Sequence, residues 1–200
     1  MGTNTTAPSS WQRERRAWDA GLNDQVNLES MSEPASNIRQ LMTRFSQPGR
    51  VEWIGRSATR RATIESCADV LLEEGTGIQG DHHATSGRSK RQVTLIQHEH
   101  LAAIASLIGQ PDVSPEQLRR NIVVSGINLL SLKSLRFRIG ETLLEGTGLC
   151  APCSRMEETL GKGGYQATRG HGGITAVVLE GGPIRVGDAV RPEQSLEIDA

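Results

Sequence analysis

Short β-rich runs separated by glycine fill the sequence from Gly49 onward, and this pattern limits the fold more than any other feature. The clearest runs are 92–96, 121–124, 135–139 and 175–179, each rich in β-branched or other apolar residues. Alternation of apolar and polar residues, which is typical of half-buried strands, appears in 135–139, at Val51 and Trp53, at Ala62 and Ile64, and at Ile184 and Val186. The pattern predicts many short strands.

Helical signals are few and short. Apolar residues of the segment 99–108 fall on one helical face, and Ser114-Pro115-Glu116-Gln117 has proline at a first helical position and a capping-box pair. A second capping box is predicted at 154–157, with Ser154 as the cap and Glu157 as its partner. Together with 22 glycines in 200 residues, these features predict a mainly β protein, a closed or nearly closed β-barrel with a few peripheral short helices.

Composition changes near residue 47. Residues 1–47 are mostly polar, with too few apolar side chains to enclose a core, and are predicted to form a flexible arm. Within the arm, 37–45 has apolar residues at helical spacing and is predicted to dock as a short helix against the domain that follows. The predicted organisation is therefore an arm (1–47), one β domain (48–192) and a short C-terminal tail (193–200).

Charge, hydropathy and cysteine usage exclude several classes of protein. The formal net charge is -1, so no strongly basic surface for nucleic acid is indicated. No apolar run approaches the length of a membrane span, and no export signal is recognisable near the N-terminus. Three cysteines cannot all pair and do not resemble a secreted disulfide scaffold. We expect a cytoplasmic protein that binds neither nucleic acid nor membrane.

Two of the cysteines, Cys150 and Cys153, stand just ahead of the helix predicted at 154–157. The partial positive charge of a helix N-terminus favours thiolate, the form of cysteine that attacks electrophiles and binds soft metals. Two interpretations of this pair alone are a thiol–disulfide exchanger and a structural zinc site that also uses histidines such as His82 and His171. Both interpretations are weak, because the pair follows many strands late in the chain and no second cysteine pair is present.

Polar clusters flank the predicted strands. A glycine-rich segment, Gly77–His83, contains Asp81 and His82. Basic residues precede two strands, at Arg88, Lys90 and Arg91 and again at Arg119 and Arg120, followed by Asn121. Such arginines bind phosphate through charge-assisted hydrogen bonds, although each one taken alone is more simply a solvated loop residue.

The order of these segments resembles the MOSC domain, which forms the C-terminus of molybdenum cofactor sulfurases and also occurs as stand-alone bacterial proteins. The resemblance covers about residues 49 to 192 and rests on six segments in one order, which are Gly77-x-x-Gly80-Asp81-His82, 91–96, 118–126, 137–140, Cys150-x-Pro152-Cys153 and 181–188.

The resemblance implies a β-barrel that binds the molybdenum cofactor, a pterin dithiolene with a phosphate. Cys153 occupies the place of the protein ligand to molybdenum, and Cys150 would be a resolving or sulfur-relay thiol or a plain buried cysteine. Candidates for the phosphate and the pterin are Arg91, Arg119, Arg120 and Asn121. Asp81 and His82 would lie near the metal, where either could donate a proton.

Two functions occur among the proteins that the chain resembles. One is an oxidoreductase that removes oxygen from N-hydroxylated compounds, and the other is the sulfurase branch, in which the domain binds the cofactor while a persulfide sulfur is transferred to it. A non-catalytic carrier of the cofactor or of sulfur is a further alternative. A reductase would need a separate electron-donor protein, because no iron–sulfur or flavin segment is recognisable. A carrier would need a partner from cofactor biosynthesis or a sulfur donor. The resemblance favours the reductase, and no pyridoxal phosphate site is expected in this chain.

Overall fold

The computed structural model describes residue 38 and residues 41–82, 84 and 89–193. Predictions about residues 1–37, His83, Arg88 and the tail after residue 193 therefore lie outside the described residues. The chain divides into two units, residues 1–42 and residues 43–200. Of the helix predicted over 37–45, residue 38 and residues 41–43 are helical.

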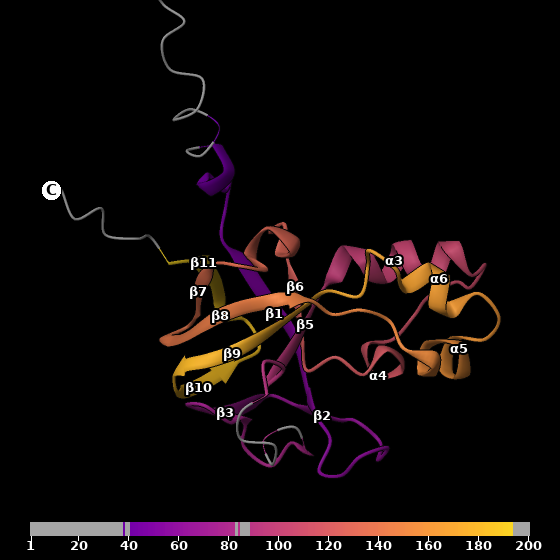
Figure 1. The fold of residues 1–200 in the computed structure, drawn as a ribbon, viewed down its shortest axis with the longest axis horizontal. Helices are drawn as coiled ribbons and strands as arrows, with labels where there is room; N and C mark the ends of the chain where they lie inside the picture. Colours follow the sequence, from indigo (N-terminus) through magenta and orange to yellow (C-terminus); the bar gives the residue numbers. More distant parts are fainter. Residues whose placement is uncertain (1–37, 39–40, 83, 85–88, 194–200) are drawn as a thin grey trace, which may run out of the picture. The chain divides into compact units, whose positions relative to one another are not determined.

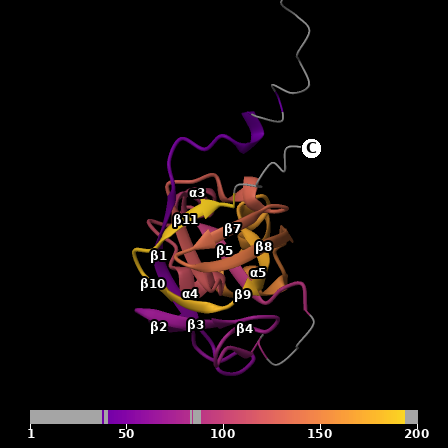
Figure 2. The same cartoon turned by 90° about the vertical axis from the view of Figure 1, so that its left-hand side faces the viewer.

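Seven strands close into a β-barrel (Figure 2). In order around the barrel they are β11 (Ala189–Pro192), β7 (Arg136–Ile139), β8 (Thr142–Leu149), β9 (Ile174–Glu180), β5 (Val93–Gln97), β6 (Ile122–Ser125) and β1 (Gly49–Arg56). Pairing of β1 with β11, where Gly49 lies opposite Val190, completes the circle. The pairs are antiparallel except β5 and β6, which run parallel and are joined by a helical crossover. The predicted mainly β barrel is confirmed.

Four further strands of the described residues lie outside this circle. β2 (Glu65–Cys67) extends the sheet beside β1, while β3 (Asp69–Glu73), β4 (Gly77–Ile78) and β10 (Gly182–Arg185) form a small separate sheet. Two predicted boundaries were wrong. Arg61 adopts a left-handed backbone with φ of 73°, so the strand begins only after Ile64, and Val186 lies beyond β10 with an exposed side chain.

The barrel interior follows the predicted alternation. On β7 the side chains of Phe137 and Ile139 are fully buried, while Arg138 points outward and pairs with Glu180 and Glu193 at 2.9 Å each. The interior is a continuous apolar cluster from all seven strands, joined by Leu129 and Leu132 of the short 3₁₀ helix η3 (Leu129–Leu132). This packing leaves polar side chains for the rims and loops.

Four short helices lie together beyond one end of the barrel (Figure 1). They are α3 (His98–Leu107), α4 (Pro115–Leu118), α5 (Ser154–Leu160) and α6 (Gly164–Thr168). A second apolar cluster, which includes Ile104, Leu118 and Met156, joins these helices to β5 and β6. The capping box predicted before α4 is confirmed, since the side chain of Gln117 accepts a hydrogen bond from the backbone of Ser114 at 2.9 Å.

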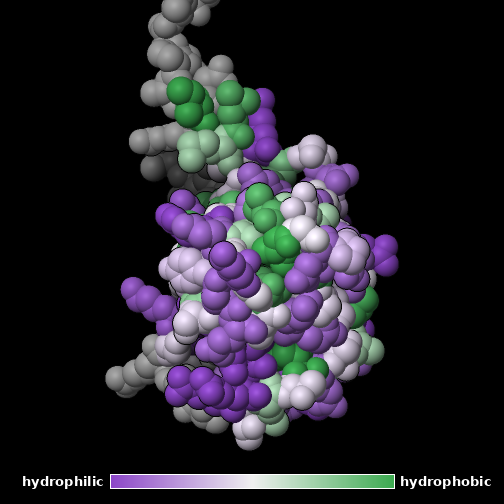
Figure 3. Space-filling view, turned by 90° about the vertical axis from the view of Figure 1, so that its right-hand side faces the viewer, coloured by the Kyte–Doolittle hydropathy of each residue, from purple (hydrophilic) through white to green (hydrophobic). Residues whose placement is uncertain are grey.

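The surface that faces the viewer in Figure 3 is largely hydrophilic, with apolar side chains in small patches between polar ones. Within the part of the chain that the structure describes, no helix is both long enough and apolar enough to span a bilayer.

Candidate functional site

The two cysteines of the Cys-x-x-Cys segment have different environments. Cys153 is exposed and is the N-cap residue of α5, with extended backbone angles (φ −126°, ψ 173°) and a carbonyl that accepts the backbone N–H of Met156 at 2.9 Å. Cys150, which directly follows β8, is 3% exposed. Solvent therefore reaches one sulfur much more readily than the other.

The predicted capping box of α5 was wrong by one residue, because Ser154 is already helical and Cys153 is the cap. Glu157 does not reach back to the cap. Its two carboxylate oxygens instead accept the backbone N–H groups of Tyr165 at 3.0 Å and of Gly163 at 2.8 Å, and these two bonds lower the pKa of Glu157. The Glu157 carboxylate binds the free N–H groups at the start of α6 instead of the backbone of its own helix. Glu157 therefore links α5 to α6.

Cys150 is fixed by the loop that precedes β9. Its backbone N–H donates to the carbonyl of Gly173 at 2.9 Å, and the neighbouring carbonyl of Gly172 accepts from Nε of Arg120 at 2.8 Å. No side chain fits at Gly172, since a Cβ there would lie 2.3 Å from the carbonyl oxygen of Cys150. The loop thus holds the first thiol next to a buried guanidinium.

Arg120 provides this buried positive charge. It is 7% exposed, and a further bond of 2.7 Å runs from its Nη1 to the carbonyl of Leu118. Burial lowers the pKa of Arg120, the thiols of Cys150 and Cys153 oppose this shift, and the positive charge of Arg91 adds to it. Three further residues predicted for the site, Arg91, Cys150 and Cys153, therefore lie within electrostatic reach of Arg120.

Arg119 belongs to a neighbouring polar network. Its left-handed backbone, with φ of 54°, ends α4 and turns the side chain toward the loop after β1, where Nη1 donates to the carbonyl of Ala62 at 2.7 Å. Burial and the charge of Arg155 lower the pKa of Arg119, whereas Asp81 raises it. Arg155 stands two residues after Cys153, so it connects this network to the exposed thiol.

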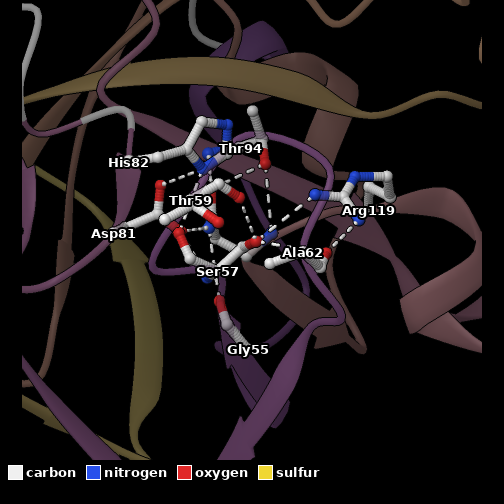
Figure 4. A network of polar contacts seen from close by, with 9 residues as sticks. Gly55, Ser57, Thr59, Ala62, Asp81, His82, Thr94 and Arg119 are labelled. Carbon is white, nitrogen blue, oxygen red and sulfur yellow. Dashed lines mark hydrogen bonds and ion pairs between the residues drawn. The ribbon is translucent and has the colours of Figure 1, made fainter.

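Asp81 and Asn121, each 3% exposed, form the buried centre of this network, and Figure 4 shows Asp81 beside Ser57 and His82. The carboxylate of Asp81 accepts the backbone N–H of Ser57 at 2.9 Å and the amide Nδ2 of Asn121 at 3.2 Å. Asn121 also donates to the carbonyl of Gly55 at 3.2 Å and accepts from the backbone N–H and the hydroxyl of Thr94 at 3.1 and 2.8 Å. These four bonds use the hydrogen-bonding capacity of the amide, which gives Asn121 a structural role. Contact between Asn121 and a cofactor stays a prediction.

His82 lies at the edge of the same network, beside Asp81. Its backbone N–H donates to the carbonyl of Ser57 at 2.9 Å, and its Nδ1 is 3.1 Å from that oxygen and 3.4 Å from a carboxylate oxygen of Asp81. Two acceptors therefore face Nδ1, which assigns the ring hydrogen to that nitrogen.

The structure brings the predicted residues into two adjoining groups, which meet where Arg119, Arg120 and Asn121 lead into β6. Sequence reasoning missed Arg155, the Ser57 backbone and the loop carbonyls. Only Arg155 had a visible signal, its position beside Cys153. Among the described residues no three His, Cys, Asp or Glu side chains gather as metal ligands, so the zinc interpretation has no support here. His171 instead packs edge-on against His100, with ring centroids 4.8 Å apart.

Comparisons with known proteins agree with this architecture. No curated protein matches the chain. Among solved structures, the YuaD protein of Bacillus subtilis is 23% identical with a TM-score of 0.64, over 72% of this chain and 94% of that chain. YiiM of Geobacillus stearothermophilus is 14% identical with a TM-score of 0.59, over 74% of this chain and 76% of that chain. YiiM of Escherichia coli is 16% identical with a TM-score of 0.55, over 74% and 71%.

These structures share the fold of the chain. The sequence comparison goes further, because residues 79–191, more than half of the chain, match the MOSC domain family, and this range contains every site residue predicted from the sequence. The chain therefore belongs to the MOSC domain family.

Proposed function

We propose that this protein binds the molybdenum cofactor beside the start of α5, with Cys153 as the protein ligand to molybdenum, and that it reduces N-hydroxylated substrates. The observation that carries the proposal is the exposed sulfur of Cys153, a helix N-cap within electrostatic reach of a buried arginine. Membership of the MOSC domain family supports a role related to this cofactor.

The residues around Cys153 fit such a ligand. A thiolate is a soft donor, suited to a metal whose other ligands are sulfur and oxo groups. Arg91, Arg120 and Arg155 supply positive charge for a phosphate, and a guanidinium pairs with phosphate in bidentate geometry. Arg120 uses Nε and Nη1 on backbone carbonyls, so its remaining nitrogen, Nη2, is the atom we assign to the ligand. Arg119 is less suited, because its guanidinium already bonds Ala62 and Ser57.

When bound, the cofactor would supply the two-electron chemistry that removes an oxygen atom from an N-hydroxylated compound. Cys153 would hold and orient the metal, and the arginines would fix the phosphate. His82 would move the proton. Because its Nδ1 is held by Ser57 and Asp81, Nε2 is the ring atom that would take up and deliver a proton. The electrons would come from a separate donor protein.

Metal and pterin content test the binding proposal. The protein and two variants, Cys153→Ser and Cys67→Ser, are purified from cells that make the cofactor, and bound molybdenum, zinc and pterin are quantified by mass spectrometry. Cys67→Ser is the matched control, since Cys67 lies on β2 among other neighbours. We expect molybdenum and pterin in the wild type and in Cys67→Ser, and a large loss of molybdenum in Cys153→Ser. Zinc without pterin, or undiminished molybdenum in Cys153→Ser, would contradict the proposal.

Turnover separates the reductase from the alternative, a non-catalytic carrier of cofactor or sulfur. Loaded protein receives a reduced viologen dye as electron donor and an N-hydroxylated amidine as substrate, and formation of the amidine is measured. A reductase oxidises the dye only when the substrate is present. A carrier retains cofactor without turnover, and a sulfur carrier acquires a persulfide on Cys153 when a sulfur-donor protein is added.

A further inference from the structure

The chain bends sharply between the strand that ends at Leu149 and the helix that begins after Cys153. The backbone N–H of Ala151 donates to the carbonyl of Leu149 at 3.1 Å, which closes a three-residue turn centred on Cys150. Only Ala151 and Pro152 separate the two cysteines, the spacing of redox-active disulfides. The bend and the spacing bring the two thiols into one small region.

The two thiols differ in their exposure to solvent and in how firmly their backbone is held. Cys150 is buried, and its backbone is fixed by the hydrogen bond to Gly173. Cys153 is exposed, and its side chain makes no capping hydrogen bond to α5, so rotation of its sulfur toward Cys150 breaks no such bond. Negative charge on either sulfur raises the pKa of the Arg120 guanidinium, so both cysteines lie near this one side chain. An accessible sulfur that meets the oxidant first and a sheltered one that resolves it is the usual arrangement of a redox-sensing pair.

We propose that Cys150 and Cys153 form a reversible intramolecular disulfide when the protein meets a hydroperoxide. The sulfur of Cys153 attacks the outer peroxide oxygen, the O–O bond breaks, and a sulfenic acid forms as the peroxide leaves as an alcohol or water. The thiol of Cys150 then attacks the sulfenic sulfur, and the second oxygen leaves as water. Two thiols are oxidised by two electrons and one peroxide is reduced by two, so the step balances.

Cys67, the third cysteine, stands outside this chemistry. It lies on β2, and its charged neighbours are Arg56, Glu65 and Asp69. Burial raises the pKa of the Cys67 thiol, with Arg56 opposing the shift, so less of it is thiolate at neutral pH. Cys67 is therefore the internal reference against which oxidation of the pair is measured.

Disulfide formation would have a consequence for the metal site, and this part rests on the proposed function. A sulfur in a disulfide has no thiolate lone pair to offer as a metal ligand, so oxidised protein could not bind molybdenum through Cys153. Conversely, a sulfur already bound to metal would be shielded from peroxide. Oxidation and cofactor loading would thus exclude each other at a single atom.

Peptide mass spectrometry tests the proposal on the full chain, purified without cofactor and reduced. The protein is treated with one equivalent of hydrogen peroxide, alkylated and digested with trypsin, which places Cys150 and Cys153 together in the peptide 139–155 and Cys67 in the peptide 62–88. We expect the mass of the first peptide to fall by two hydrogens and its two cysteines to stay unalkylated. Reduction with dithiothreitol should restore alkylation of both cysteines. The peptide with Cys67 should be alkylated as before.

The Cys150→Ser variant provides the decisive comparison. For this comparison both proteins receive two equivalents of hydrogen peroxide, because the step from sulfenic to sulfinic acid consumes a second peroxide. Without the resolving thiol, Cys153 should then advance to the sulfinic acid, which dithiothreitol does not reverse. If wild-type Cys153 is over-oxidised as fast as in Cys150→Ser, or if Cys67 forms the bond, the proposal is wrong. The pterin measurement is independent of this outcome. Protein that forms the disulfide but never binds pterin would refute the proposed function and its consequence for the metal, and leave the disulfide standing.

Discussion

Gly173 is the residue at which a single added methyl group should most clearly loosen the candidate site. Its backbone φ is +84°, and a Cβ would lie 1.9 Å from the carbonyl oxygen of Leu95 and 2.8 Å from the Cα of Ile96. Both contacts are backbone atoms of β5, a central barrel strand, so no side chain can rotate away. The carbonyl of Gly173 is also the acceptor for the N–H of Cys150.

Gly173→Ala therefore combines two costs. A left-handed conformation costs an ordinary residue about 1–2 kcal/mol, and forcing extra atoms into packed surroundings costs about 1–3 kcal/mol. The smaller conformational freedom of alanine in the unfolded chain returns about 0.4–1 kcal/mol. We expect a net destabilisation of about 2–4 kcal/mol, a large part of the ~5–15 kcal/mol that stabilises a typical domain.

Gly170→Ala, in the same loop, is the matched control. Its φ is +78°, close to that of Gly173, but no atom lies within 4 Å of the added Cβ, so only the conformational terms remain. Urea unfolding should give a loss of about 1 kcal/mol or less for Gly170→Ala. Alkylation of Cys150 in native protein should be faster in Gly173→Ala alone. Equal unfolding midpoints for the two variants would refute the reasoning from the close contact.

Two further predictions concern stability. Asn121→Ala removes four hydrogen bonds at buried positions and should cost about 3–5 kcal/mol in urea unfolding, whereas Asn128→Ala, at an exposed position, should cost little. His100 should make stability pH-dependent, because burial and the neighbouring His171 lower its pKa from 6.5, with Glu99 opposing. The unfolded chain then binds the proton more tightly, so the contribution of neutral His100 is fully present above about pH 6.5 and is lost as the pH falls through the lower folded-state value. His100→Gln should flatten the urea midpoint between about pH 7 and about pH 5, and an unchanged slope would contradict this origin.

The strands that were predicted best from the sequence are those in which the local strand preference of the residues and their burial in the fold favour the same structure. β5, β6, β7 and β9 are rich in β-branched and apolar residues, and burial adds to a preference that is already local. β8 escaped prediction because Gly146 and Gly148 interrupt its apolar pattern. The barrel requires them, since a Cβ on Gly146 would lie 2.1 Å from the carbonyl oxygen of Leu132 and the register of β8 shifts between the two glycines.

Residues of the candidate site divide in the same way. The helix start beside Cys153 could be predicted to within one residue from the sequence alone, because it depends on a short local segment, and the role of Cys153 as a metal ligand stays a proposal. The hydrogen bonds of the Asn121 amide could not be predicted, because its partners Gly55, Asp81 and Thr94 come from three distant segments. His171 was named as a ligand in the zinc interpretation, and its packing against His100 could not be predicted because it depends on how α3 meets the loop before β9.

The closing pair of the barrel has a consequence for how the chain folds. Gly49 pairs with Val190, so the first and last barrel strands meet only when nearly the whole described domain is available. During synthesis on the ribosome, Gly49 and Arg50 of β1 therefore emerge long before their partners on β11, whereas the end of β1 pairs with β2, which follows soon after it in the chain. Contacts between residues so distant in sequence slow folding, and unpaired edges invite association with other chains. The start of β1 is thus open to association with other chains until Ala189–Pro192 emerge and close the barrel.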